Sequence, residues 1–281
     1  MKLTGLFLYP VKSLGGISVS SAELDALGLV GDRRFLVIDE TGRFLTQRTL
    51  PRMALIATAL DATHLTLSVS PRLLASLAPA ISIRVARASD PTAPLRTVSV
   101  WKSENLLAED CGDAVAAFLS DFLSIRCRLV RLGAAFHRPV LKPTARPGDT
   151  VTFADAYPLL VIGESTLADL NDRLVAQGTA ALPMNRFRPN VVITGAPAFA
   201  EDTWPRFRIG SVTFRAGGPC ARCILTTTDQ ATGARDGPEP LRTLATYRRA
   251  PAAPTDVNFG QNLIHETKSG TLTVGDAISV L

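Results

Sequence analysis

The chain has 281 residues, of which 46% are hydrophobic and 20% charged, with a net charge of +5, which suits a globular protein of one large or two coupled domains. Its apolar N-terminal run is too short for a signal peptide, and no stretch reaches the roughly 18–20 apolar residues of a membrane span. We therefore expect a cytoplasmic protein without a membrane partner, whose 4 cysteines are reduced thiols.

The positive charge does not indicate a nucleic-acid partner. Most of the 30 lysines and arginines are interspersed with acidic residues, and no recognition-helix or RNA-platform motif is present. One segment differs, because residues 126–146 contain basic side chains and no acidic ones. This segment is a solvated loop, an anion-facing lip or a docking patch for an acidic partner.

The N-terminal part of the chain contains short apolar runs separated by turn residues, a pattern typical of β-strands. A Glu-Thr-Gly turn at residues 40–42 joins two of these runs into a hairpin. The patterns predict strands at residues 3–11, 31–39, 43–46, 54–60, 64–69, 81–87 and 96–101.

After residue 102 the spacing of apolar residues becomes helical, and we predict a helix at residues 104–123. The residues that carry this prediction are Val115, Phe118, Leu119 and Phe122. A second amphipathic helix is predicted at residues 164–175. The change of pattern predicts an N-terminal β-rich domain at residues 1–102 and a second domain at residues 103–281.

Further strands are predicted at residues 190–194, 206–215 and 271–281. The regular alternation of strand and helix that a doubly wound sheet requires is missing. Irregular strands with two embedded helices instead favour an α+β fold with a β-barrel-like sheet.

Two cysteines three residues apart, Cys220 and Cys223, stand out in the stretch GGPCARCILTTTD. A zinc site would need further ligands, and the other cysteines and the histidines are scattered. A thioredoxin-type pair would open a helix, but residues 224–228 have the composition of a strand. Two buried thiols, or one thiolate ligand for a soft or oxo-metal centre beside Arg222, remain open.

Two other stretches contain residues that favour anions. In YPVKS, Lys12 and Ser13 follow a predicted strand and precede two glycines, which suits either a phosphate cradle or an ordinary exposed turn. In NRFRPN, strand alternation would send Arg186 and Arg188 to the same face, toward an anion or a salt-bridged strand entrance. The motifs GxGxxG, GxSxG and HExxH are absent, which argues against flavin, nicotinamide and serine-hydrolase chemistry.

Taken in order, several fragments together resemble the MOSC family, and more narrowly the bacterial relatives of the mitochondrial amidoxime-reducing component. The fragments are YPVKS, GDRRF, TQR, GESTLADLN, NRFRPNVVITG, PCARCILTTTDQATG, EPLRTLATYR and FGQN. The resemblance covers nearly the whole chain. It implies an N-terminal β-barrel-like MOSC-associated domain and a MOSC domain that encloses the molybdenum cofactor, Mo-molybdopterin.

The resemblance also implies roles for individual residues. It makes Cys220 the ligand of molybdenum and the catalytic residue, with Cys223 as a neighbour rather than a ligand. Five further residues match positions that hold the phosphate and polar edge of the pterin. They are Lys12, Ser13, Arg33, Arg188 and Asn190.

The activity that the resemblance implies is that of a molybdenum-dependent oxidoreductase. Its substrates would be small N-hydroxylated compounds such as amidoximes, hydroxylamines and N-hydroxylated bases. Some bacterial relatives carry a ferredoxin-like domain after the MOSC domain, whereas this sequence ends at Leu281. We therefore expect a separate electron donor, an iron–sulfur protein or a flavoprotein reductase. The alternative is a carrier of molybdenum cofactor or of sulfur, with a persulfide on Cys220.

Overall fold

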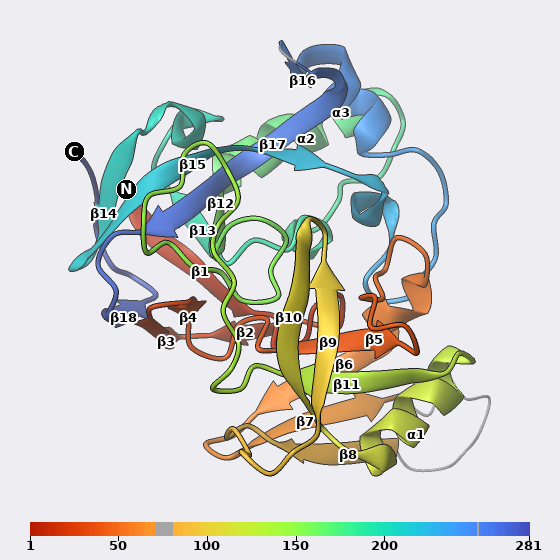
Figure 1. Cartoon of the computed structure of the whole chain (residues 1–281). Helices are drawn as coiled ribbons and strands as arrows, with labels where there is room; N and C mark the ends of the chain where they lie inside the picture. Colours follow the sequence, from red (N-terminus) through yellow and green to blue (C-terminus); the bar gives the residue numbers. More distant parts are fainter. Residues whose placement is uncertain (71–80, 252) are drawn as a thin grey trace.

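The computed structural model describes residues 1–70, 81–251 and 253–281. A nine-stranded sheet forms its larger part (Figure 1). Its strands lie in the spatial order β19 (Ile278–Val280), β14 (Arg206–Ile209), β15 (Val212–Arg222), β17 (Ala253–His265), β12 (Leu159–Gly163), β13 (Val191–Thr194), β1 (Lys2–Leu8) and β2 (Ile17–Val19), and β16 (Arg249–Ala250) pairs with β17. Strands β12 and β13 run parallel, and the other pairs in this sheet are antiparallel.

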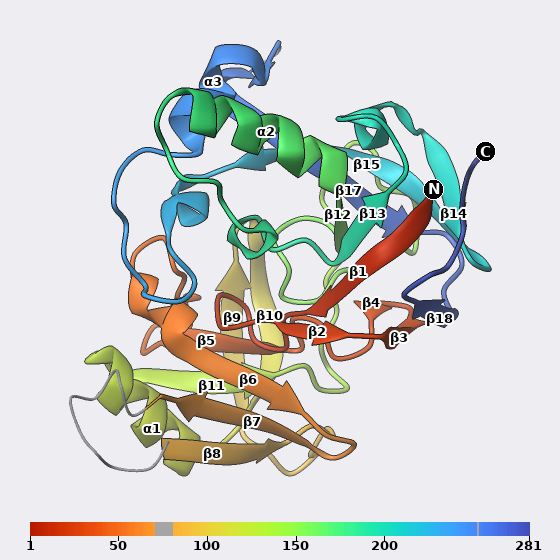
Figure 2. The ribbon, with the colours of Figure 1, turned by 180° about the vertical axis from the view of Figure 1, so that it is seen from behind.

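Smaller sheets complete the described chain. One contains β5 (Phe35–Asp39), β11 (Cys127–Arg131), β10 (Ser103–Asp110) and β9 (Leu95–Val100); another contains β18 (Gly270–Thr273), β3 (Ser21–Asp25) and β4 (Gly28–Leu29); a third contains β6 (Ile56–Leu60), β7 (His64–Val69) and β8 (Ile81–Ala86). The β9–β10 hairpin points its tip toward the nine-stranded sheet in both ribbon views (Figures 1 and 2).

The α-helices are α1 (Asp113–Leu123), α2 (Glu164–Ala176) and α3 (Leu241–Tyr247), and short 3-10 turns lie at Pro51–Leu55, Met184–Arg186, Ala200–Thr203 and Ile224–Thr227. Helix α2 lies across β12 and β13, as Figure 2 shows. Leu170 and Leu174, four residues apart on its inner face, are buried with Ile162 of β12. The amphipathic pattern seen in the sequence thus covers one face of the sheet.

The core beneath the smaller sheets follows the two periodicities of the sequence. In β7, Leu65, Leu67 and Val69 alternate with more exposed residues, so this strand buries one face. Val115 and Leu119 of α1 pack into the same cluster. Alternating strands and a single amphipathic helix therefore enclose one apolar layer.

The α+β class predicted from the sequence is confirmed, and most of the predicted strands are present within a few residues. The predicted domain boundary falls at the tip of the β9–β10 hairpin and stays a prediction. The strands that the sequence patterns did not indicate include the short β2, β3, β4 and β16 as well as β11, β12 and the long β17. No helix in the described ranges is long and apolar enough to cross a membrane.

Several predicted elements are wrong in part. The predicted strand at 206–215 is a hairpin of β14 and β15, and residues 43–46 contain isolated bridges instead of a strand. The first half of the predicted helix at residues 104–123 is strand β10, and the helix begins only at Asp113. Residues 224–227 form a 3-10 turn rather than a strand, because the hydroxyls of Thr226 and Thr227 bond the carbonyls of Cys223 and Ile224. The predicted strand at 271–281 is interrupted between β18 and β19.

Candidate functional site

One cavity brings together all the residues that the resemblance assigned to cofactor binding. They are Lys12, Ser13, Arg33, Arg188, Asn190 and Cys220. They come from the turn after β1, the segment before β5, the segment before β13, and strand β15. Residues far apart in the sequence thus meet at a single place, and their binding role stays a prediction.

The lining of this cavity is strongly cationic. Besides Lys12, Arg33 and Arg188 it contains Arg48 and Arg222, whereas Asp155 is the acid among its described residues. Several guanidinium groups directed at one space suit an anionic ligand, because each can form paired hydrogen bonds to phosphate.

The backbone is strained at this cavity. Seven non-glycine residues of the described chain have positive φ values, and Ser13 (68°), Arg33 (45°) and Arg188 (55°) are among them. The left-handed region is unfavourable for residues that carry a Cβ, and such conformations concentrate at ligand-binding sites. The strain here directs two arginines and one hydroxyl residue into the same space.

Cys220 lies on β15 at a place where the strand departs from regular pairing. The register of β15 against β17 shifts between Ala216 and Gly218 and again between Pro219 and Ala221. Such bulges turn side chains to new directions. Nη1 of Arg222 donates a hydrogen bond to Sγ of Cys220 at 2.9 Å.

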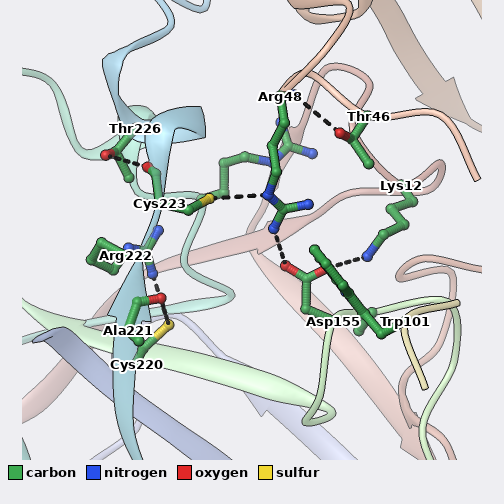
Figure 3. A network of polar contacts seen from close by, with 12 residues as sticks. Lys12, Thr46, Arg48, Trp101, Asp155, Cys220, Ala221, Arg222, Cys223 and Thr226 are labelled. Carbon is green, nitrogen blue, oxygen red and sulfur yellow. Dashed lines mark hydrogen bonds and ion pairs between the residues drawn. The ribbon is translucent and has the colours of Figure 1, made fainter. Parts of the chain in front are cut away.

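Cys223 has a different partner. Nε of Arg48 donates a hydrogen bond to its Sγ at 3.2 Å, and Figure 3 shows the sulfurs of Cys220 and Cys223 beside different arginines. Both are free thiols. No three His, Cys, Asp or Glu side chains of the described ranges gather as a metal site. The two cysteines therefore do not act as one unit in this structure.

The ring of Tyr9 packs against the guanidinium groups of two of the cavity's arginines. The guanidinium carbons of Arg33 and Arg188 lie 4.4 Å and 4.2 Å from the centre of its ring. The Tyr9 hydroxyl donates to the carbonyl of Pro189 at 3.1 Å, and burial raises its pKa to about 12. The neutral phenol therefore holds two cations at a fixed spacing. The sequence patterns did not indicate this role, although Tyr9 belongs to the YPVKS stretch.

Asn190 and Arg33 are linked directly. Nη1 of Arg33 donates to Oδ1 of Asn190 at 2.9 Å and to Oδ2 of Asp32 at 2.6 Å. Asn190 is buried, and its Nδ2 donates to the carbonyl of Phe7 at 3.1 Å. Asn190 thus positions the arginine and ties the segment before β13 to β1.

The opposite wall of the cavity is a network around Asp155 (Figure 3). Its carboxylate pairs with Lys12, accepts from Nη2 of Arg48 at 3.3 Å and accepts from Nε1 of Trp101 at 2.9 Å. Burial raises the pKa of this carboxyl, but Lys12 and Arg48 outweigh burial and hold the pKa well below its usual range. Arg48 and Trp101 were not predicted as site residues, since only the folded chain brings them here.

Two known domain families match this chain. The MOSC N-terminal beta barrel domain matches residues 1–126, and the MOSC domain matches residues 148–279. Mitochondrial amidoxime-reducing component 1 of Mus musculus is 38% identical and aligns over 98% of this chain and 81% of its own length.

The chain belongs to the MOSC family. Two other members are component 1 of Homo sapiens, 35% identical over 98% of this chain and 82% of the relative, and component 2 of Macaca fascicularis, 34% identical over 97% and 81%. The cavity lies between the two MOSC matches. Lys12 and Arg33 come from the N-terminal match, and Arg188 and Cys220 come from the MOSC domain match.

Within this MOSC fold, the two arginines of NRFRPN do not point the same way. Arg188 lines the cavity, whereas Arg186 donates to the carbonyl of Thr227 at 3.0 Å and pairs with Asp229 at 2.8 Å. The prediction that alternation sends both to one face is wrong. Residues 184–186 form a 3-10 turn and Arg188 has a positive φ, so the period of a strand does not apply.

The basic segment at residues 126–146 is not a continuous docking patch. Arg131 pairs with Glu109 at 2.8 Å, and Arg146 pairs with Glu266 at 2.8 Å. Arg138 is only 3% exposed and donates to Ser103 and to backbone carbonyls. Arg131 and Arg138 are therefore buried structural residues, whereas Arg146 is exposed, and the docking interpretation for the rest of the segment stays a prediction.

We expect sulfate binding to the cofactor-free protein to weaken as the pH rises through about 8. Burial, partly offset by Asp155, lowers the pKa of Lys12 to about 8, so its ammonium group is charged below that pH and neutral above it. If the ammonium form binds the anion, affinity falls about tenfold between pH 7 and pH 9. Calorimetry with sulfate, which does not titrate in this range, measures the change. In the Lys12→Met variant the sulfate affinity should be lower and independent of pH. If this variant keeps the pH dependence of the wild type, Lys12 is not the group that binds the anion.

Proposed function

We propose that this protein is an enzyme that reduces small N-hydroxylated compounds and that it binds the molybdenum cofactor, Mo-molybdopterin, to do so. The observation that carries the proposal is that the sulfur of Cys220 shares one cavity with Lys12, Arg33 and Arg188. The names of the relatives, amidoxime-reducing components, support the same substrate class for this chain.

The chemistry of the cavity fits the cofactor. A pterin phosphate is anionic, and the described lining offers five cationic side chains and one carboxylate. Nε of Arg222 is buried without a hydrogen-bond partner in the described chain, which leaves a donor free for a ligand. Cys220 supplies a soft sulfur ligand of the kind that thiolate-binding metals prefer.

Residues of the chain would bind the cofactor and fix its orientation. Lys12, Arg33 and Arg188 would hold the phosphate, and Asn190 would fix the direction of Arg33. Cys220 would ligate the metal, with Arg222 holding its sulfur in place. When bound, the cofactor supplies the two-electron chemistry by which an N–O bond is reduced and water released.

We also propose that electrons come from a separate protein, an iron–sulfur protein or a flavoprotein reductase. The location in the cytoplasm, like the identity of this donor, stays a prediction from the sequence.

Protein made in a molybdenum-replete host tests the proposal. We expect close to one molybdenum and one pterin per chain, and conversion of benzamidoxime to benzamidine with reduced methyl viologen as donor. Metal analysis and product chromatography measure both. Protein that carries an added sulfur on Cys220 in mass spectrometry, but no molybdenum and no reductase activity, would establish the carrier alternative instead.

A further inference from the structure

A second cavity of about 370 Å³ lies beside the first. The two share Arg48, Asp155, Ala156 and Ala221 as a common wall. Ala221 directly follows Cys220, which lines the first cavity, so the common wall lies one residue away from the cysteine along the chain. This volume is in the range of small-molecule sites, which usually combine apolar walls with a few polar groups.

Trp101 lines this second cavity in an unusual conformation. It follows β9 at the tip of the β9–β10 hairpin, with a φ of 56°. This region of φ favours glycine, and a bulky residue there is a true outlier. A large aromatic side chain at such a position costs the fold stability, and strain of this kind persists where function requires it.

The ring of Trp101 is held from several sides. It lies beside Arg48 and Asp155 (Figure 3); its Nε1 donates to Oδ1 of Asp155 at 2.9 Å, and the guanidinium of Arg48 lies 4.4 Å from its ring. The ring of Phe44 meets it edge-on at 5.2 Å. Trp101 nevertheless remains 49% exposed. Trp101 is therefore a fixed aromatic surface that still has area free for contact.

A second apolar side chain faces the same space. Leu141 is 56% exposed and, like Trp101, lines the second cavity. Large apolar groups that stay exposed in a concave site indicate a ligand with an apolar body. Asp155 and Arg48 form a polar wall toward the first cavity, and Lys102, Arg138 and Lys142 also line the second one. The cavity thus combines exposed apolar groups with several charged ones.

We propose that the second cavity holds the organic body of the substrate and that Trp101 selects N-hydroxylated compounds whose body is a flat ring. The proposal rests on the proposed function, since it presumes that the N–O group reaches the cavity of Cys220. Trp101 and Leu141 contact the ring, while the wall formed by Arg48 and Asp155 faces the polar end of the substrate.

Steady-state kinetics with benzamidoxime and acetamidoxime, a ring and a methyl group on the same reacting unit, test the selection. With reduced methyl viologen as donor, Trp101→Ala should raise KM for benzamidoxime about tenfold, and at least about fivefold more than it raises KM for acetamidoxime. Trp101→Phe, which keeps a ring but loses the N–H, should retain most of the preference. Leu141→Ala, at an exposed position where truncation leaves the core intact, should raise KM for benzamidoxime about threefold.

Fluorescence gives a readout without turnover. The chain has 2 tryptophans, and Trp204 is only 6% exposed, so added ligands reach Trp101 alone. Benzamidoxime without reductant should quench the wild-type emission, and Trp101→Phe should abolish this change; acetamidoxime should have little effect.

The outcomes separate this inference from the proposed function. If Trp101→Ala loses activity equally with both substrates, Trp101 does not select the ring. If the defect appears only with a protein donor, the selection is also overturned, and this face is a surface where the donor docks. If the wild type reduces neither substrate, the proposed function fails, and the quenching titration still decides whether Trp101 binds the ring.

Discussion

We expect the Cys220→Ser variant to lose at least about 100-fold of the wild-type rate of benzamidoxime reduction. Serine keeps the size of the side chain and can still accept a hydrogen bond from Arg222, so the fold of β15 should survive. What changes is the ligand atom, from a soft sulfur to a hard hydroxyl oxygen. Removing a residue that only hydrogen-bonds a metal ligand typically lowers metal affinity or activity 10–100-fold. Loss of the ligand itself should therefore lower activity by more than that. Turnover with reduced methyl viologen and molybdenum content of the same sample are measured together.

The matched variant is Cys223→Ser. Its sulfur accepts one hydrogen bond, from Arg48 at 3.2 Å, and a serine hydroxyl can accept the same bond. A change of one such bond is worth about 1 kcal/mol, so the rate should stay within several-fold of the wild type. If both variants lose activity alike, the two thiols work as a pair and the assignment of a single ligand is wrong.

The sequence could predict the family and the identity of the cavity residues because both depend on short stretches with distinctive chemistry. The PCARCILTTTDQATG stretch carries much of the resemblance, and the family is confirmed over nearly the whole chain. The structure places Lys12, Arg33 and Cys220 around one cavity.

The sequence could not predict elements whose partners lie far away. The apolar residues that suggested a helix at 104–123 all lie after Gly112, where α1 indeed forms. Before Gly112, pairing with β9 and β11 makes the chain a strand, and no local pattern reveals that pairing. The same holds for β17, which is long because both β12 and β15 pair with it.

The detailed geometry of the site was equally inaccessible to pattern reasoning. Alternation treats Arg186 and Arg188 alike, but the positive φ of Arg188 turns only that side chain into the cavity. Arg48 and Trp101 join the site through Asp155, a contact between residues more than 50 positions apart. Strain and long-range contacts of this kind follow from the folded chain, not from local periodicity.

The second large effect that we expect is a difference in cofactor retention between variants of Arg188 and Arg186. Arg188→Gln should reduce the molybdenum and pterin retained after dialysis by at least about tenfold, because a charge-assisted contact to phosphate is worth about 1.5–3 kcal/mol. Arg186→Gln should leave the cofactor content per folded chain unchanged, since that side chain is engaged with Asp229 and the carbonyl of Thr227. Metal and pterin assays on the two purified variants make the comparison.

Although Arg188→Gln should weaken cofactor retention, it should not destabilise the cofactor-free protein. Burial lowers the pKa of Arg188 to about 10, so at neutral pH the fold holds a cation that it disfavours. For a base, a pKa lowered on folding destabilises the folded state at every pH below that value, by about 1.4 kcal/mol per pKa unit. Removing this charge should offset the lost contacts with Tyr9 and Gln230, so the Tm of Arg188→Gln stays equal or rises.

Arg186→Gln, by contrast, breaks an ion pair that the fold uses, and its Tm should fall by several degrees. This contrast is what we expect if a strained, poorly solvated arginine is retained for a ligand that supplies the missing charge. Thermal denaturation of both cofactor-free variants at pH 7 measures this contrast. A lower Tm for Arg188→Gln with full cofactor retention would show that Arg188 is a structural residue and remove the main support for a phosphate at this place.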